Sequence, residues 1–364
     1  MTSIFTATTL KWKKYKKLGA GSYGTVYLAG EANSLFLGGS FAAVKSAEFE
    51  HSKETIKEAE FLKEVADNPY IVRCFGEDIS IEKGKEVYNM LMEYAPGGTL
   101  HDLIVAYNVK GSTMPESHAA VYSYMLLGGL SHVHRRGLVH CDLKPCHILV
   151  FPKINGTDLH HLKIADFGLA KHVWEDHPVE FLRRHRGTQV YASPESIMFR
   201  MHGTATDVWS LGCTILEMMT GRQTWTDEEM WDLYVEMVQG PSSVISKLGK
   251  DFLRRFFLTD PNCRWTAPML LDHPFITQNM KGLPPVEETQ FQNNPFGIYD
   301  GWIVIEHLFS TPSQPQSYPS FLSQPSPPKE NSSYQLFPIQ CNTQAVGGPF
   351  SIPCGIESVN RLLA

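Results

Sequence analysis

The sequence predicts an α+β fold with two lobes, a small antiparallel β lobe that contains one helix and a larger, mainly helical lobe. Short β-rich runs separated by glycine turns occupy the chain up to about residue 94. One amphipathic helical stretch interrupts these runs, and helical periodicity dominates after Gly97. Since strand-like runs give way to helical ones at 92–98, we expect the lobes to join there and a ligand cleft to lie between them.

The expected strands and helices can be placed by residue number. The stretch Ser52–Ala66 predicts a helix, because its apolar residues recur at helical spacing and Ser52 is a good N-cap residue. Two further segments, 116–135 and 207–220, are apolar nearly all round and predict buried helices. The β-rich runs predict strands at 24–30, 41–49 and 87–95.

The expected organisation is an N-terminal extension at 1–11, a folded domain at 12–280 and a tail at 281–364. Within the folded domain we expect the small lobe at about 12–94 and the large lobe at about 98–280.

The tail differs in composition from the rest of the chain. Residues 281–364 hold 12 of the 23 prolines, only nine charged residues and stretches rich in serine and glutamine, which predicts a disordered regulatory tail. Its segment 297–309 is apolar enough to dock on the folded domain or on a partner. The alternative is that this segment is collapsed without regular structure.

Composition excludes several classes of protein. The chain of 364 residues is 43% apolar and has a net charge of −6, which suits a folded protein and argues against nucleic-acid binding. Seven cysteines without a CxxC pair argue against a disulfide framework or a structural zinc site. No signal peptide and no apolar run of about 18 residues occur, so we expect no membrane span and a cytoplasmic or nuclear location, or both. These features do not predict the oligomeric state.

The glycines at 19, 21 and 24 form the first motif with chemical meaning. Glycines let backbone amides approach phosphate oxygens closely. A dinucleotide-binding fold needs a helix after the third glycine, but strand-like sequence follows Gly24, so we expect a strand–turn–strand flap over phosphates. An ordinary glycine-rich hairpin is the alternative.

A lysine on an apolar strand forms the second motif. Lys45 follows Ala43 and Val44, and a buried ammonium needs an anionic partner. Glu58 on the following helix is the candidate, because Leu62 one turn later faces the core and places Glu58 on the same side. Taken singly, each charge also suits an exposed surface position.

Two acidic groups complete the set. Asp142 and Lys144 lie in a short irregular loop between apolar runs, where a base next to an electrostatic stabiliser is expected. Asp166 follows a strand and offers the hard oxygen ligand that Mg²⁺ prefers. The runs 192–195 (ASPE) and 207–212 (DVWSLG) come next.

In this order and spacing, the motifs of residues 12–280 resemble those of the eukaryotic protein kinase family. The resemblance implies ATP as a cofactor together with Mg²⁺, or Mn²⁺ as an alternative. It implies catalytic roles for Asp142 and Lys144, and metal binding by Asp166 and at the position of His147. The residues that it places around ATP are Leu18, Gly19, Ala20, Gly21, Ser22, Tyr23, Gly24, Thr25, Val26, Lys45, Glu58, Glu93 and Ala95.

The resemblance also implies finer assignments. Lys144, two residues after Asp142, matches serine/threonine kinases, and Thr188 is expected to pack beside both. Met92 falls at the gatekeeper position, and the backbones of Glu93 and Ala95 would face adenine. Glu195 is expected to pair with Arg264 in a structural contact.

The wording of several motifs narrows the resemblance. GSYGTVYLA, AVKSAE, the cysteine in HCDLK and ADFGLAK are most similar to mitogen-activated protein kinase kinase kinases, particularly those of plants. This similarity implies a protein substrate, namely a downstream mitogen-activated protein kinase kinase.

His147 departs from the family pattern, which has asparagine there as a metal ligand. Imidazole is a softer ligand than an amide oxygen, so we expect weaker Mg²⁺ binding, better tolerance of Mn²⁺ or Zn²⁺, and weakened phosphoryl transfer. The alternative is that His147 merely packs and one Mg²⁺ on Asp166 suffices. His147 is also the main support for a rival interpretation, a pseudokinase or nucleotide-binding scaffold.

Cys141 is the second departure, because many kinases carry arginine there to meet a phosphate on the activation loop. From Leu169 to Arg186 the chain contains no Ser, Thr or Tyr. We therefore expect activity that does not depend on phosphorylation within this segment. The basic cluster 183–186 (RRHR) is either a solvated loop face or a surface that attracts acidic residues of a protein substrate.

Overall fold

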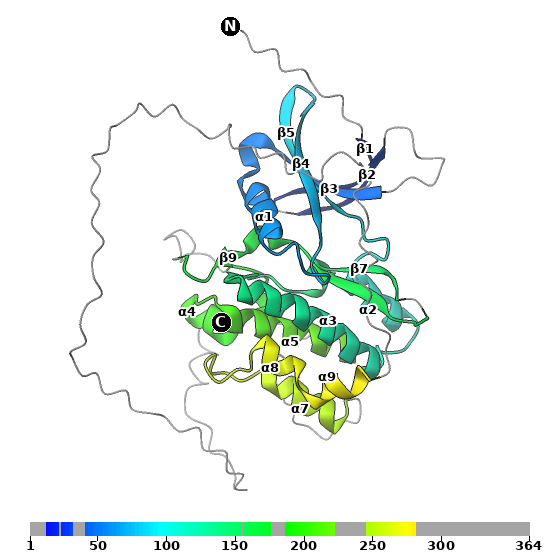
Figure 1. The fold of residues 1–364 in the computed structure, drawn as a ribbon, viewed down its shortest axis with the longest axis vertical. Coiled ribbons are helices and arrows are strands. Elements are labelled where there is room, and N and C mark those ends of the chain that lie inside the picture. The colour runs from blue at the N-terminus through cyan, green and yellow to red at the C-terminus, as the bar shows by residue number, and fades with distance from the viewer. Residues whose placement is uncertain are drawn as a thin grey trace, which may run out of the picture. The chain divides into compact units, whose positions relative to one another are not determined.

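The computed structural model describes residues 12–21, 23–31, 41–154, 156–175, 186–222 and 245–281. It confirms the predicted α+β architecture, with an antiparallel sheet and one helix in the small lobe and helices in the large lobe (Figure 1). The expected extension at 1–11, the tail beyond Lys281 and the basic residues 183–185 lie outside the described residues.

The small lobe is built on one sheet. Among the described residues, five antiparallel strands follow the order β1-β2-β3-β5-β4. The runs predicted as strands correspond to β2, β3 and β5. The bounds are β1 Trp12–Gly21, β2 Gly24–Glu31, β3 Phe41–Glu48, β4 Cys74–Glu82 and β5 Lys85–Glu93.

Helix α1, Lys53–Glu64, packs on this sheet and begins where the sequence predicts it. Its buried residues include Ala59 and Leu62, which have no exposed surface. The expected side-chain cap is wrong, because the Ser52 hydroxyl donates to the Phe49 carbonyl at 2.7 Å instead of accepting from the helix. A short 3₁₀ turn at Phe49–His51 causes this difference by bringing that carbonyl within reach.

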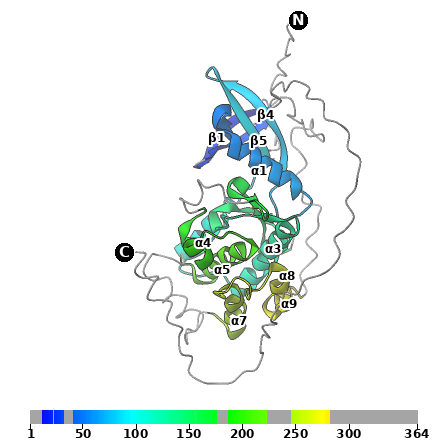
Figure 2. The same cartoon turned by 90° about the vertical axis from the view of Figure 1, so that its left-hand side faces the viewer.

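The large lobe lies below the sheet in both views (Figures 1 and 2). The predicted helix at 116–135 is present with the same bounds, whereas the helix predicted at 207–220 begins three residues earlier, at Thr204. The helices are α2 Leu100–Val109, α3 Glu116–Arg135, α4 Pro194–Phe199, α5 Thr204–Thr220, α7 Lys247–Phe256, α8 Ala267–Leu271 and α9 Pro274–Asn279. Two strand pairs complete the lobe, β6 Leu138–Val139 with β9 Lys171–His172, and β7 Ile148–Lys153 with β8 His160–Ile164.

A continuous hydrophobic cluster runs through both lobes. It contains Leu62 of α1, Leu126 of α3, Phe167 after β8 and Leu216 of α5, all fully buried. Backbone contacts join the lobes as well, since the Val72 amide donates to the Ile164 carbonyl at 2.9 Å. The loops between the lobes are therefore anchored on packed elements from both sides.

Within the described residues, no helix has the length and apolar character that a membrane crossing requires. The same ranges contain free thiols at Cys74, Cys141, Cys146, Cys213 and Cys263.

A buried ion pair ties α4 to the C-terminal part of the large lobe, as the sequence predicts. The Arg264 guanidinium donates to both carboxylate oxygens of Glu195, at 2.6 and 3.0 Å. Both residues are about 95% buried, with exposed fractions of 4% for Arg264 and 5% for Glu195. Because burial removes water from both charged groups, each of them is stabilised mainly by the other.

Replacing Arg264→Met should destabilise the protein strongly, because Glu195 would remain buried without a counter-charge. We expect the free energy of unfolding to fall by about 3–5 kcal/mol. Urea unfolding followed by tryptophan fluorescence measures it. Lys153→Met is the matched control, since its pair with Asp158 is exposed and should contribute far less to stability than the buried pair. Equal losses in the two variants would contradict the structural role of the buried pair.

Candidate active site

A cavity of about 390 Å³ opens between the two lobes and contains most of the predicted site. Its size lies in the range of about 300–1,000 Å³ that is typical of small-molecule sites. Apolar lining residues come from both lobes, and the charged lining residues include Lys45 and Asp166. Its lining includes Leu18, Gly19, Val26, Ala43, Met92, Glu93, Ala95, Cys146, His147, Leu149 and Ala165.

The glycine motif forms the predicted strand–turn–strand flap at the β1–β2 turn, where Gly21 pairs with Gly24. Gly24 has a φ of +146°, and a Cβ there would lie 2.8 Å from the Ser46 carbonyl oxygen, so the fold itself requires glycine. A Cβ at Gly19 or Gly21 would meet no atom within 4 Å. Packing within the protein therefore does not require glycine at positions 19 and 21, and the space beside them is open to a ligand. Ser22 lies outside the described residues.

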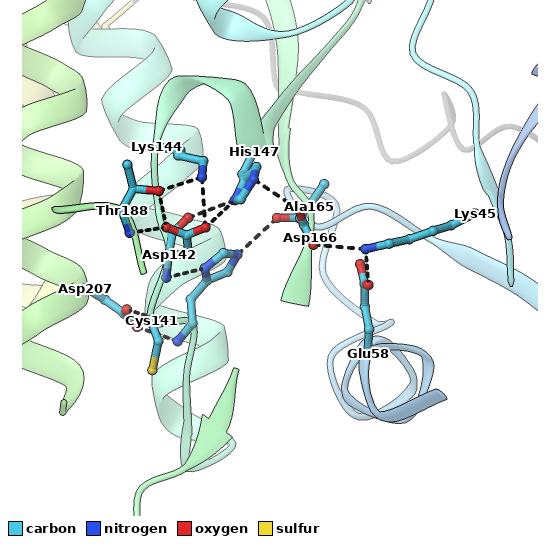
Figure 3. A network of polar contacts seen from close by, with 11 residues as sticks. Lys45, Glu58, Cys141, Asp142, Lys144, His147, Ala165, Asp166, Thr188 and Asp207 are labelled. Atoms are coloured by element: carbon cyan, nitrogen blue, oxygen red, sulfur yellow. Dashed lines mark hydrogen bonds and ion pairs between the residues drawn. The ribbon is translucent and has the colours of Figure 1, made fainter. Parts of the chain in front are cut away.

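Lys45 of β3 joins the two lobes, as Figure 3 shows. Its ammonium donates to the Glu58 carboxylate at 2.6 Å and to Asp166 Oδ1 at 3.1 Å. The predicted contact between Lys45 and Glu58 is thus present, and both residues are buried. Helix α1, strand β3 and the turn after β8 meet at this one ammonium.

Burial and pairing shift the pKa values of these three groups. Burial by itself lowers the pKa of Lys45, but Glu58 and Asp166 outweigh it and the pKa lies above its ordinary value. Burial raises the pKa of Glu58 to about 7, although Lys45 opposes the shift. Burial also raises the pKa of Asp166, but Lys45 and then His147 outweigh it and hold the pKa at about 2. Lys45 and Asp166 are therefore charged at neutral pH.

Asp142 is fixed on both carboxylate oxygens. Oδ1 accepts hydrogen bonds from the Thr188 amide at 2.8 Å and from its hydroxyl at 2.7 Å. Oδ2 accepts one from the Lys144 ammonium at 2.9 Å, and that ammonium also donates to the Thr188 hydroxyl at 2.6 Å. The predicted packing of Thr188 beside both residues is confirmed, and the carboxylate is held in one orientation.

Asp207 of α5 holds the loop that carries Asp142, a contact that the sequence did not predict. Its carboxylate accepts from the backbone amides of His140 at 2.8 Å and Cys141 at 2.9 Å. The His140 ring nitrogen Nε2 lies 3.0 Å from the Ala165 carbonyl oxygen, which links this loop to the residue before Asp166. The DVWSLG run at 207–212 singled out Asp207 in the sequence, but it did not indicate which backbone amides Asp207 would contact.

Gly187 brings the chain before Thr188 close to the same loop. Its φ is +90°, and a Cβ at this position would lie 2.4 Å from the Cys141 carbonyl oxygen. Cys141 itself has a φ of +66°, which is unusual for a residue with a side chain. The close approach of two backbones therefore sets the position of Thr188 against Asp142.

His147 lies between the two acidic groups of the site. Its Nδ1 is 2.9 Å from the Asp142 carbonyl oxygen, and its Nε2 is 3.0 Å from Asp166 Oδ2. Burial lowers the pKa of His147, although the nearby Asp166 and Asp142 oppose the shift. When Nδ1 donates to the carbonyl, the lone pair of Nε2 faces a carboxylate oxygen.

This nitrogen and oxygen form a donor pair that suits a divalent cation. A lone pair facing a carboxylate is unfavourable without a proton or a metal between them. Asp166 supplies a hard oxygen ligand and His147 a softer nitrogen ligand, and nitrogen ligands suit Mn²⁺ better than Mg²⁺. The residues present therefore fit a bound metal ion at this position.

The segment that connects the lobes contains a second buried ion pair, which the sequence analysis missed. The Lys163 ammonium of β8 donates to the Glu93 carboxylate at 2.6 Å, and the Arg73 amide donates to the same oxygen at 3.3 Å. The Glu93 carboxylate is thus engaged by Lys163 and Arg73, and Glu93 lines the cavity together with Met92 and Ala95. The ion pair therefore ties the segment that connects the lobes to strand β8.

Comparison with known proteins identifies the family. A profile described as protein kinase domain matches residues 12–276. The chain belongs to the protein kinase family. Among its relatives in Arabidopsis thaliana, mitogen-activated protein kinase kinase kinase 20 is 35% identical over 283 residues, covering 75% of this chain and 80% of the relative. Mitogen-activated protein kinase kinase kinase 18 is 34% identical over 318 residues, covering 83% and 87%. The protein is a serine/threonine kinase, and members of its family use ATP and a divalent metal ion.

Two glycine substitutions should separate fold from ligand binding in this kinase. Gly24→Ala should lower the free energy of unfolding by about 1–2 kcal/mol, because of its positive φ and the clash with Ser46. Gly21→Ala should leave stability within about 0.5 kcal/mol, because the added methyl group meets no protein atom, yet weaken nucleotide binding several-fold. Thermal unfolding and titration with a fluorescent ATP analogue measure the two effects. A Gly21→Ala variant that binds the analogue normally would refute a ligand-facing flap.

Proposed function

We propose that this kinase transfers the γ-phosphoryl group of ATP to serine or threonine of a protein substrate and acts as a mitogen-activated protein kinase kinase kinase. The observation that best supports this proposal is an uninterrupted chain of polar contacts between the two lobes. It runs from Glu58 through Lys45, Asp166, His147 and Asp142 to Lys144. The names and coverage of the relatives support the cascade tier and suggest a mitogen-activated protein kinase kinase as the substrate.

The residues of the site suit this reaction in distinct ways. The Asp142 carboxylate, oriented by Thr188 and Lys144, would orient the substrate hydroxyl and accept its proton. The ammonium groups of Lys45 and Lys144 would offset negative charge on the phosphates. A bound Mg²⁺ or Mn²⁺ at Asp166 and His147 would supply further neutralisation of phosphate charge. The glycine flap would exclude water from the transferred group.

Replacing Asp142→Asn tests the transfer directly, because the amide keeps the shape of the side chain but cannot accept the proton. We expect incorporation of labelled phosphate into a mitogen-activated protein kinase kinase to fall by about 10²–10⁴-fold. Nucleotide affinity should change little. Incorporation that is equal in the variant and the wild type, or absent from both, would count against the proposed activity.

A nucleotide-binding scaffold is the second candidate, and the geometry of His147 favours it. The imidazole occupies the space between the Asp142 carbonyl and Asp166, with both ring nitrogens engaged at 2.9 and 3.0 Å. If that contact persists in the nucleotide complex, metal binding is reduced and transfer with it. Nucleotide binding without phosphate incorporation would support this candidate.

Replacing His147→Asn should increase turnover with Mg²⁺, since an amide oxygen is the harder ligand. By analogy with altered metal shells, we expect a gain of about tenfold to a hundredfold with Mg²⁺ and a smaller change with Mn²⁺. Initial rates at saturating ATP with each ion measure this change. His101→Asn is the control, because its ring is exposed and lies outside the cavity lining. An unchanged ratio of the Mg²⁺ to the Mn²⁺ rate would show that His147 only packs.

A further inference from the structure

Helix α1 must be held in place for the site to exist, because it carries Glu58. Inside the small lobe, the Thr55 hydroxyl donates to the Tyr23 carbonyl at 2.7 Å and so links α1 to the glycine flap. Thr55 and Glu58 are both buried. A shift of α1 would therefore disturb the flap and the Lys45 contact together.

The opposite side of α1 meets a short segment of the large lobe, residues 171–175. The Lys57 ammonium forms an ion pair with Glu175 at 3.0 Å. One turn later, Phe61 packs edge-on against the His172 ring, with centroids 5.4 Å apart. The same lysine lies 5.1 Å from the centre of the Phe61 ring. In Figure 1, α1 and β9 are drawn next to each other.

The segment 171–175 is itself fixed to the large lobe. Its strand β9 pairs with β6, and the Val173 amide donates to the Gly137 carbonyl at 2.8 Å. Trp174 stacks on His172 with ring centroids 4.3 Å apart. The buried Lys171 ammonium donates to the Glu175 carbonyl at 3.2 Å. The segment that carries the Glu175 carboxylate is thus tied to the large lobe by backbone hydrogen bonds.

The charge of Glu175 is permanent at neutral pH. Partial burial raises its pKa, but the hydrogen bond and charge of Lys57 outweigh burial and keep the pKa below its ordinary value. The surrounding segment, Leu169–Arg186, has no hydroxyl group that a kinase can phosphorylate.

We propose that Glu175 is a positioning residue, whose carboxylate holds α1 against the large lobe through Lys57 and thereby keeps Glu58 on Lys45. The proposal rests on the proposed function and adds how the site is kept assembled. A carboxylate encoded in the chain supplies the anionic contact that phosphorylation of this segment cannot provide. The kinase is therefore assembled without an activating phosphate between Leu169 and Arg186.

The size of the effect follows from the exposure of the pair. Lys57 and Glu175 are 37% and 34% exposed, and ion pairs of this kind change an equilibrium constant by up to about fivefold. Reversing one charge replaces attraction by repulsion, so an effect of about fivefold is expected. Because the pair is partly in water, salt should weaken it.

A charge-swap experiment on the full chain tests the proposal. Lys57→Glu and Glu175→Lys alone should each speed hydrogen exchange of the backbone amides of 53–64 by about fivefold and lower phosphoryl transfer by a similar factor. The double variant, with both charges reversed, should recover to within about twofold of the wild type in both measurements. Added salt should narrow the difference between wild type and single variants.

An ion pair remote from α1 provides the control for this experiment. Lys153→Glu reverses an exposed charge that pairs with Asp158 away from α1, and should change neither measurement. A double variant as impaired as the single ones, or single variants with unchanged exchange at 53–64, would overturn the proposal. If the wild type transfers no phosphate, the proposed function fails, whereas the exchange data still decide for or against Glu175 by the same criterion.

Discussion

The ion pair between the Lys45 ammonium and the Glu58 carboxylate is the constraint on which the rest of the site depends. Both groups are buried, so neither is stable there without the other. The pair joins the sheet to α1, and the contact of Lys45 with Asp166 extends it to the large lobe. The two lobes are thus connected through the Lys45 ammonium, and movement of α1, β3 or the turn after β8 would change at least one of its two contacts.

The contacts that the sequence could predict are those with a local physical reason. A lysine on an apolar strand needs a partner, and helical spacing left Glu58 as the candidate on α1. The bounds of α3 followed from a run that is apolar on nearly every face. Strand-like sequence after Gly24 was enough to distinguish a hairpin flap from a helix-opening glycine motif. In each case neighbouring residues carried the information.

Other parts of the site could not be predicted, because their partners are distant in sequence or are backbone atoms. Asp207 bonds to two main-chain amides some 66 residues earlier, and an amide leaves no mark in a sequence pattern. Lys57 and Glu175 are 118 positions apart, and Lys163 and Glu93 are 70 apart. Ser52 is not a side-chain cap for the same kind of reason, since its hydroxyl donates to the neighbouring Phe49 carbonyl and accepts no hydrogen bond from a helix amide. Only the assembled fold decides among such competing partners.

The close approach of the Gly187 and Cys141 backbones restricts which mutations of the gene this protein can tolerate. Hydrogen is the only substituent that fits there, because the Cys141 carbonyl oxygen lies 2.4 Å from where a methyl carbon would be. Every missense change of this codon would wedge two strands of backbone apart and withdraw the Thr188 amide from Asp142. Such an allele would encode a protein in which the Asp142 carboxylate has lost one of the hydrogen bonds that orient it.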